Sequence, residues 1–340
     1  MANFSQEPDT AVAVLGKALE WLRQGHQVAL ATVVRTWGSS PRRAGSMAAI
    51  NETGAFCGSV SGGCVETSVL EEALEAMEHG HSLTLSFDVS DESAWSVGLA
   101  CGGTIAIRVV PMTGPGAVHS ELYDAVVASI GQRRSCFLVT DLASNRVDFY
   151  RTSARLRACF PGLPSGQLEA GVFNAREQQW FLNVFEPPTR LIVLGGVHIA
   201  QMLVPMAQLA GFDITVVERR KAFAAEARFP GVPVLIENAG VALGKLAPDA
   251  RTAVVALTHN PELDDPGLIA ALDSPAFYVG ALGSRRTQEQ RRLRLLECGV
   301  GLGQVERLHA PIGLPIGAAT PGEIAVSILS EIVSVFRGKG

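Results

Sequence analysis

The chain has 340 residues, of which 47% are hydrophobic and 18% charged, and its formal net charge is −5. This length suits two domains of ordinary size, and a charged fraction below the roughly 25% of an average globular chain argues against disorder. Because the balance is acidic and no run of lysine or arginine is interleaved with aromatic residues, we expect no nucleic-acid partner.

The six cysteines and the first residues indicate a cytoplasmic protein. The cysteines form no CxxC pair and no dense disulfide spacing, which predicts reduced thiols. Residues 1–10 lack the basic start of a signal peptide. The uncharged stretch 191–212 has the length of a membrane span, but Gly195, Gly196 and Pro205 interrupt it. We therefore expect a strand, a turn and a helix there, and no membrane span.

The first half of the chain is predicted to mix helices with short strands. In chain order we expect a helix at 11–24 capped by Asp9 or Thr10, strands at 27–35 and 47–51, a helix ending near 79–80, strands at 83–89 and 104–110, a helix at 120–130, and strands at 136–140 and 180–185. Glycine-rich loops at 57–66 and 98–103 separate some of these elements. This half is expected to be an α+β domain over residues 1–186.

Strands and helices alternate in the second half, after Pro187 and Pro188, which favour an extended linker. We expect strands at 190–194, 213–218, 232–236, 252–258 and 277–282. We also expect one helix that ends at Ala210, one near 266–272, and a last one that begins after the N-cap Thr320, which forms a capping box with Glu323. This alternation is typical of a doubly wound parallel sheet. The chain is therefore predicted to be an α/β protein whose C-terminal domain, residues 189–340, is Rossmann-like.

A modified dinucleotide fingerprint, Gly195-Gly196-Val197-His198-Ile199-Ala200, follows the first strand of that domain. Gly195 and Ala200 suit the first and third glycine positions of the pattern GxGxxG/A. Val197 occupies the second, where a missing Cβ normally admits the pyrophosphate. Tight NAD(P) binding in the usual pose is therefore not expected.

Two side chains near the fingerprint each allow two interpretations. Glu218, at the end of the next strand, is either an acceptor for a ribose hydroxyl or a solvated carboxylate beside Arg219 and Arg220. His198 either contacts a phosphate or another cofactor group, or caps a helix at the surface.

Cys64 and Cys101 stand in the glycine-rich loops of the first half. Cys64 opens a helix, whose positive N-terminal end favours a thiolate. The two thiols are candidates for ligating a soft metal, carrying a persulfide or binding a dithiolene ligand, since glycines such as Gly102 and Gly103 admit a bulky group. The alternative is that both cysteines pack as small apolar side chains beside turns.

Two further loops end predicted parallel strands, the edge at which such sheets bind ligands. Gly283-Ser284-Arg285-Arg286 opens an arginine-rich helix whose amides and guanidinium groups suit a phosphate. The alternative is a capping serine on a solvated helix. Thr258-His259-Asn260 ends the neighbouring strand and is a candidate ligand contact at the same edge. The alternative is an ordinary polar loop.

These motifs together resemble the XdhC/CoxI family, the accessory proteins of molybdoenzymes of the xanthine dehydrogenase and carbon monoxide dehydrogenase type. The resemblance covers nearly the whole chain and depends on residues 58–66, 101–103, 258–260, 280–286, 311–317 and 320–325. In the family the fingerprint is usually GAGH followed by an apolar residue and Gly or Ala. Gly195, His198 and Ala200 match it, whereas Val197 departs from it.

The resemblance implies an N-terminal XdhC/CoxI domain, a Rossmann domain, and a chaperone that binds molybdenum cofactor, as molybdopterin or its dinucleotide form. Such a chaperone protects the cofactor, promotes its sulfuration and inserts it into an apo-enzyme, without turnover of its own. The implied partners are a cysteine desulfurase and the large subunit of a molybdenum hydroxylase. The resemblance does not decide whether the chain forms a homodimer. The alternatives are an NAD(P)-dependent oxidoreductase and a persulfide sulfurtransferase.

In this interpretation the cofactor's phosphate or dinucleotide end binds the Rossmann half, while Cys101 and Cys64 face the molybdenum. The residues expected to contact the cofactor are Cys64, Cys101, Gly102, Gly103, Gly195, Gly196, His198, Glu218, His259, Gly283, Ser284 and Arg285.

Overall fold

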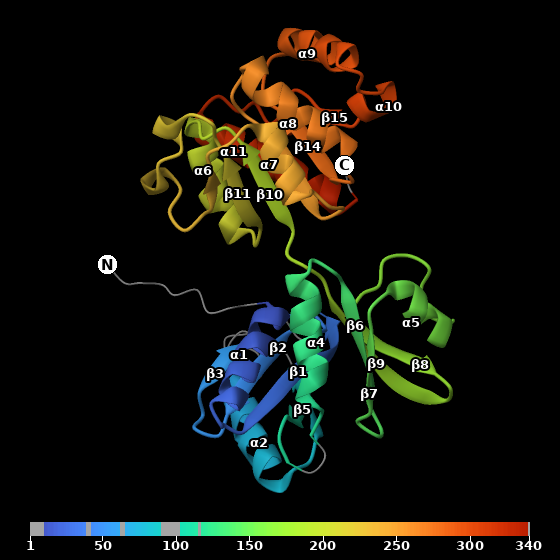
Figure 1. Ribbon diagram of the computed structural model, residues 1–340. Helices are drawn as coiled ribbons and strands as arrows, with labels where there is room; N and C mark the ends of the chain where they lie inside the picture. Colours follow the sequence, from blue (N-terminus) through green and yellow to red (C-terminus); the bar gives the residue numbers. More distant parts are fainter. Residues whose placement is uncertain (1–9, 39–41, 62–64, 90–102, 115–116, 339–340) are drawn as a thin grey trace. The chain divides into compact units, whose positions relative to one another are not determined.

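The computed structural model describes residues 10–38, 42–61, 65–89, 103–114 and 117–338 (Figure 1). The chain divides into two compact units, Met1–Pro187 and Pro188–Gly340, and each is described by itself. The division falls between the two consecutive prolines.

The N-terminal unit contains two antiparallel sheets with strand orders β3-β2-β1-β5-β4 and β7-β6-β9-β8. The first consists of β1 (Val28–Gly38), β2 (Met47–Asn51), β3 (Phe56–Gly58), β4 (Leu83–Val89) and β5 (Gly103–Pro111). The second consists of β6 (Cys136–Asp141), β7 (Val147–Tyr150), β8 (Gly171–Ala175) and β9 (Gln178–Phe185). The helices of this unit are α1 (Ala11–Arg23), α2 (Glu66–His79), α4 (Ser120–Gly131) and α5 (Ser153–Cys159).

Helices cover the sheets of this unit through apolar faces that the sequence spacing predicts. The hydroxyl of Thr10 caps α1, which packs with α4 against one face of the first sheet. Helix α2 covers the opposite face and ends at Gly80 in the left-handed conformation, as predicted. Helix α5 and a cluster of apolar side chains around Phe160 pack on the second sheet, on the face opposite α4. The expected α+β character of this half is confirmed.

The short elements β3, β7, β8 and α5 of this unit were not predicted from the sequence. Every residue of β7 is only half-buried, so its side chains show no clear alternation of apolar and polar residues. The turn between β8 and β9 is formed by Arg176 and Glu177, both with positive φ, and neither is a usual turn residue for that conformation.

The C-terminal unit is a six-stranded sheet of order β12-β11-β10-β13-β14-β15 in which every pair is parallel. Its strands are β10 (Arg190–Leu194), β11 (Asp213–Val217), β12 (Val234–Leu235), β13 (Thr252–Ala256), β14 (Tyr278–Ala281) and β15 (Leu308–His309). Numbered from β10, this is the order 3-2-1-4-5-6 of the Rossmann fold. The predicted fold class is confirmed.

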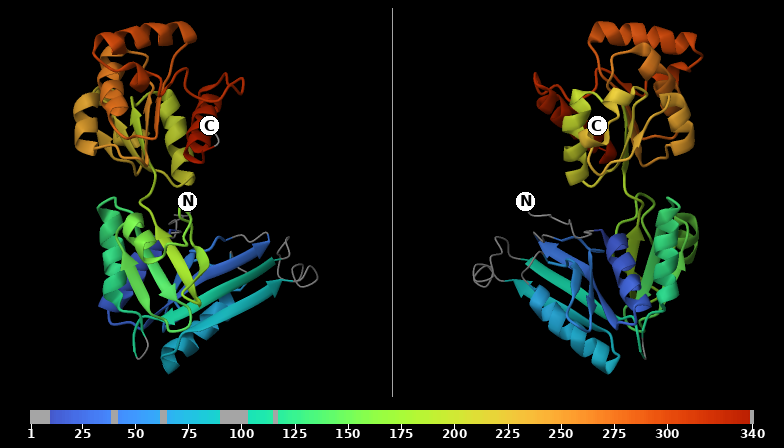
Figure 2. Two further views of the ribbon diagram at one scale, coloured as in Figure 1. Left: turned by 90° about the vertical axis from the view of Figure 1, so that its right-hand side faces the viewer. Right: turned by 60° about the vertical axis from the view of Figure 1, so that its left-hand side comes forward.

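Helices lie on both faces of this sheet, as both views of Figure 2 show. Helices α6 (His198–Leu209) and α11 (Pro321–Phe336) pack on one face. The other face is covered by α7 (Ala239–Leu246), α8 (Pro261–Asp273), α9 (Arg285–Glu297) and α10 (Leu302–Val305). Both predicted capping-box bonds between Thr320 and Glu323 are present at the start of α11.

The short elements α7, α10 and β15 of this unit were not predicted, and the largest boundary difference is at the start of a helix. The helix expected near Pro266 begins five residues earlier, at Pro261, because Asn260 caps it and Pro261 takes the first helical position. Pro266 then lies inside the helix. The stretch 191–212 is strand β10 followed by α6, and no helix in the described ranges is long and apolar enough to cross a membrane.

Candidate functional site

The carboxyl edge of the C-terminal sheet collects most of the residues singled out in the sequence. Parallel strands end together at this edge, so the loops after β10, β11, β13 and β14 are neighbours there. Strand order reverses between β10 and β13, whose ends Leu194 and Ala256 are paired. That reversal is the switch point at which doubly wound sheets bind ligands. The structure brings to this edge Gly195, Gly196, His198, Glu218, His259, Gly283, Ser284 and Arg285.

The two glycines of the fingerprint are required by packing within the protein. Gly195 has φ +104°, and a Cβ there would lie 2.3 Å from Cγ2 of Thr258 in the neighbouring loop. A Cβ on Gly196 would lie 2.4 Å from the carbonyl oxygen of Phe223. Both distances are far below a van der Waals contact, so a larger residue fits at 195 only if the Thr258 side chain moves, and at 196 only if the backbone at Phe223 moves.

Glu218 is buried and bonded within the protein. Its side chain accepts hydrogen bonds from the Gly196 amide at 2.9 Å and from the Arg220 amide at 2.8 Å. It also accepts two from the Arg220 guanidinium, at 2.9 and 2.7 Å. Burial acts to raise the pKa of Glu218, but the bonds from Arg220 and Gly196 outweigh it and hold the pKa below its usual value.

These contacts exclude one of the two interpretations of Glu218. With 2% of its surface exposed it is not a solvated carboxylate, so that interpretation is wrong. A ribose hydroxyl would have to displace at least one of the four bonds. The segment after β11 adds to this obstacle, because Arg228 donates to the Phe223 carbonyl and to Gln201 of α6 and so holds the segment over the fingerprint.

The first turn of α6 differs from those of the other long helices in this unit. Side chains of the N-cap residues accept a bond from the first turn in α7, α8, α9 and α11; these residues are Asn238, Asn260, Ser284 and Thr320. The N-cap of α6 is Val197, and no side-chain bond caps that helix within the part of the chain described. Amides at such a helix start are available to an anion. His198, the first helical residue, is exposed beside them.

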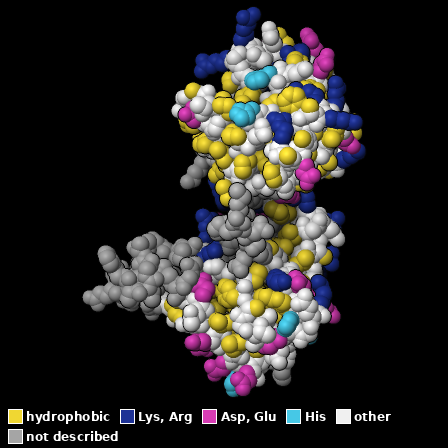
Figure 3. Space-filling model, turned by 90° about the vertical axis from the view of Figure 1, so that its left-hand side faces the viewer, with side chains coloured by type: hydrophobic (Ala, Val, Ile, Leu, Met, Phe, Trp, Pro, Cys, Tyr) yellow, Lys and Arg dark blue, Asp and Glu magenta, His cyan; other side chains and the backbone are white. Residues whose placement is uncertain are grey.

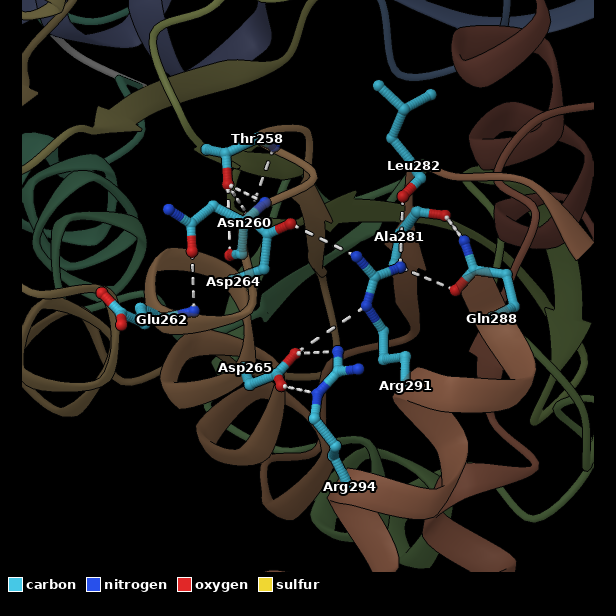
Figure 4. A network of polar contacts seen from close by, with 10 residues as sticks. All are labelled: Thr258, Asn260, Glu262, Asp264, Asp265, Ala281, Leu282, Gln288, Arg291 and Arg294. Carbon is cyan, nitrogen blue, oxygen red and sulfur yellow. Dashed lines mark hydrogen bonds and ion pairs between the residues drawn. The ribbon is translucent and has the colours of Figure 1, made fainter. Parts of the chain in front are cut away.

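A buried network supports the loop after β13 (Figure 4). Asp264 is fully buried, and its Oδ1 accepts bonds from the hydroxyl and amide of Thr258, at 2.7 and 3.3 Å. Its Oδ2 accepts from Arg291 at 3.3 Å, and Arg291 also donates to the Leu282 carbonyl at 3.1 Å. Burial raises the pKa of Asp264, which the Thr258 bonds and the Arg291 charge oppose. The network fixes the ends of β13 and β14 relative to each other.

Arg291 was missed in the sequence, although a spacing there could have indicated it. Arg291 and Arg294 are three residues apart on α9, and Asp264 and Asp265 are adjacent on α8. Arg294 bonds Asp265 at 2.7 Å, parallel to the Arg291–Asp264 pair. Two arginines on one helix face and two adjacent carboxylates indicate a paired contact between helices.

His259 stands exposed in this supported loop with φ +60°. A non-glycine residue in the left-handed region costs conformational energy and is enriched at functional sites. Thr258 before it is fixed by Asp264, and Asn260 after it accepts from the Glu262 amide. The loop therefore presents His259 outward on a rigid base.

In the loop after β14, Gly283 has φ +147°, and the Ser284 hydroxyl accepts from the Thr287 amide at 3.3 Å. Serine capping of α9 is thus confirmed. Arg285 and Arg286 are exposed at the start of that helix. Figure 3 shows histidine side chains, and side chains of lysine or arginine, on one face of the C-terminal unit among hydrophobic ones.

The predicted thiol loops of the N-terminal unit are described only at their margins. Cys64, Cys101 and Gly102 lie outside the described residues, and Gly103 begins β5 opposite Gly38. Glu66, at the start of α2, accepts bonds from the Ser59 hydroxyl and the Ser61 amide, both at 3.0 Å. It therefore closes the base of the first glycine loop.

Two of the described cysteines lie away from solvent. Cys57 and Cys136 are buried, and burial raises the pKa of the Cys136 thiol to about 11. No group of three or more histidine, cysteine or carboxylate side chains that suits a metal occurs among the residues described.

Comparison with known proteins identifies the family. The profile of the XdhC Rossmann domain matches residues 191–332, and that of the XdhC and CoxI family matches residues 21–88. The chain belongs to the XdhC and CoxI family. The resemblance inferred from the motifs is thereby confirmed.

Two relatives of this XdhC and CoxI family member are curated proteins of similar length. It is 29% identical to the molybdenum cofactor insertion chaperone PaoD of Escherichia coli K12, over 95% of this chain and 87% of PaoD. It is 27% identical to a Bacillus subtilis 168 protein named as a probable subunit of xanthine dehydrogenase, over 92% of this chain and 94% of that protein.

A crystal structure from Bacillus halodurans, described as a xanthine dehydrogenase, has the same fold. It superposes with a TM-score of 0.75 at 24% identity and covers 97% of both chains. The XdhC Rossmann profile runs from β10 into α11 and so contains the whole carboxyl edge described above. The family profile of the N-terminal unit contains the glycine loop that Glu66 closes.

Proposed function

We propose that this chain is a maturation factor that carries molybdenum cofactor and delivers it to an enzyme of the xanthine dehydrogenase type. One observation carries the proposal: the switch-point edge offers an uncapped helix start and exposed basic side chains. Glu218, the carboxylate that would accept a bond from the ribose of a dinucleotide, is already hydrogen-bonded to Gly196 and Arg220. The edge suits an anionic ligand but not a dinucleotide in the usual pose.

The names of the relatives support the choice of cargo. PaoD is named a molybdenum cofactor insertion chaperone, and the Bacillus subtilis relative is named a probable xanthine dehydrogenase subunit. Molybdenum cofactor ends in a phosphate or a dinucleotide diphosphate, and either is an anion of the kind that an uncapped helix start binds.

The phosphate end of the cargo would contact the α6 amides near Gly196, with His198 and His259 on either side. Gly283, Ser284 and Arg285 would line the neighbouring loop and add positive charge. Cys64, Cys101, Gly102 and Gly103 would face the molybdenum and its dithiolene, because thiolates are ligands that a soft metal prefers. In this arrangement the protein holds and shields its cargo and needs no turnover of its own.

Sulfuration of the cargo with a cysteine desulfurase, and transfer to the large subunit of a molybdenum hydroxylase, belong to the same proposal. Both place the chain in the cytoplasm. An NAD(P)-dependent oxidoreductase is the less favoured function, because Val197 fills the second glycine position and Glu218 is occupied.

The test is the cofactor content of the purified protein. Full-length chain is isolated without oxygen from a molybdate-supplied host, and its molybdenum and oxidised pterin are measured. We expect His198→Ala and His259→Asn to lower the pterin content severalfold; asparagine keeps the left-handed backbone at 259. His79→Ala, which alters an exposed histidine on α2, is the matched control and should load normally.

Two results would contradict the proposal. Equal pterin in wild type and both edge variants would exclude the edge as the cargo site. Equal molybdenum in wild type, Cys64→Ala and Cys101→Ala would exclude the cysteine contacts.

A further inference from the structure

An open groove lies in the N-terminal unit, where the outer half of β1 approaches β8. It has a volume of about 320 Å³, a size found among small-molecule sites. The polar side chains on its wall are Arg35, Thr36, Asn174 and Gln179, and the other lining residues are small or β-branched. Asn174 and Gln179 are paired across β8 and β9, so their two carboxamides lie on the same face of that hairpin.

The polar side chains of the groove are available to a ligand. Arg35, Asn174 and Gln179 are exposed, and within the described ranges none of these side chains has a hydrogen bond or an ion pair. A carboxamide both donates and accepts, whereas a guanidinium only donates. The groove therefore suits a ligand whose edges carry acceptors on one side and a mixture of donors and acceptors on another.

Trp37 stands next to this groove, directly after Thr36, with 78% of its surface exposed. The other two tryptophans of the described residues, Trp21 and Trp180, are 8% and 4% exposed. An indole buries a large apolar area in most proteins, and exposed tryptophans are enriched where a ligand or partner binds. Water satisfies the polar wall of the groove, but it does not offset the exposure of the indole.

The register of the first sheet puts the indole on the same face as Arg35. In this register Arg35 pairs with Ala106, and Trp37 pairs with Thr104. Residues two apart on a strand share a face and lie about 7 Å apart, a separation that one small ligand can span. The neighbours across the strand are small, which leaves the indole ring open to a flat group.

The same end of β1 adjoins the second glycine loop. Gly38 pairs with Gly103, where β5 begins after that loop. The indole is thus one residue from the place where the proposed function puts the molybdenum and its dithiolene. Because the dithiolene of the cofactor belongs to a ring fused to the pterin, a site for the pterin should adjoin the site for the metal.

We propose that Trp37 and this groove bind the pterin ring of the cargo. The ring stacks on the indole, its O4 and N5 accept from Arg35, and its aminopyrimidine edge faces the carboxamides of Asn174 and Gln179. Arginine reads the equivalent pair of acceptors, O6 and N7, on guanine. This inference rests on the proposed function and adds to it the residues that recognise the ring.

The test is binding of two pteridines to the full-length protein, followed by the fluorescence anisotropy of the ligand. One is 6-hydroxymethylpterin, which has the O4 acceptor. The other is 2,4-diamino-6-hydroxymethylpteridine, which has an amino donor in that place. We expect the wild type to bind the pterin about tenfold more tightly, as one bidentate arginine contact predicts.

Variants separate stacking from hydrogen bonding. Trp37→Ala should weaken both ligands by roughly fivefold or more and keep the preference, because stacking tolerates a change of ring substituent, and Trp37→Phe should retain most of the binding. Arg35→Met should abolish the preference for the pterin. Arg155→Met and Leu209→Ala change exposed side chains elsewhere and should bind both ligands as the wild type does.

Three results would overturn the inference: no binding of the pterin to the wild type, equal binding of the two ligands, or undiminished binding in Trp37→Ala. If Trp37→Ala does not fold, the loss of preference in Arg35→Met decides. The pterin content of the purified chain separates this inference from the proposed function. A wild type that carries no pterin contradicts the function itself, whereas equal pterin in wild type and Trp37→Ala contradicts only the role of Trp37.

Discussion

Replacing Glu218 by glutamine should destabilise the C-terminal unit by about 2–3 kcal/mol at neutral pH. The carboxylate accepts four hydrogen bonds, from the Gly196 amide and from the amide and guanidinium of Arg220. Glutamine removes the charge and turns one acceptor into a donor that faces another donor. A single charge-assisted bond contributes roughly 1.5–3 kcal/mol, and the partial exposure of Arg220 keeps the total near that range.

The effect should depend on pH in a fixed direction. The folded pKa of Glu218 is lowered, so its stabilisation is fully present above the ordinary value of 4.5 and is lost as the pH falls through the folded pKa. The difference between wild type and variant should therefore shrink in acid. Glu226→Gln changes an exposed carboxylate in the same segment and should stay within about 0.5 kcal/mol of wild type.

The assay must follow the C-terminal unit, which contains no tryptophan. Urea unfolding by circular dichroism, combined with hydrogen exchange of the Gly196 and Arg220 amides, reports the relevant unit. Equal stability of Glu218→Gln and wild type at pH 7, or a difference that grows in acid, would refute the reasoning.

Three further outcomes follow from the carboxyl edge. Gly196→Ala places a Cβ 2.4 Å from a carbonyl oxygen and should cost about 1–3 kcal/mol in a urea melt, whereas Gly244→Ala, a helical site with open space, should not destabilise. Asp264→Asn leaves Arg291 buried without its charge partner and should cost about 3–5 kcal/mol by the same melt; a loss below about 1 kcal/mol would contradict the network. Fluorescence titration with NADH should detect no micromolar binding, to wild type or to Val197→Gly, because Glu218 stays bonded in both; micromolar binding would favour the oxidoreductase.

Local patterns in the sequence predicted most of the C-terminal unit. The alternation of strands and helices, and the capping residues Thr320 and Glu323, depend on neighbours a few residues apart. The same holds for α1, whose C-cap Gln24 is followed by Gly25, and for α2, whose C-cap is Gly80. Short half-buried strands such as β7 lack such a pattern and were missed.

The chemistry of the sites depends on partners that are distant in the sequence. Glu218 was open to two interpretations because its bond to Gly196 joins residues 22 positions apart. Arg291 reaches Asp264 across 27 positions. Spacing alone does not show which of these side chains is bonded and which is exposed.

Hydrogen exchange of the full-length chain, with and without bound molybdenum cofactor, tests the central claim most directly. The account predicts that bound cofactor slows exchange at the start of α6, in the loop at 258–260 and at the start of α9, where the edge amides lie. Cofactor that binds without slowing exchange in any of these three segments would contradict it.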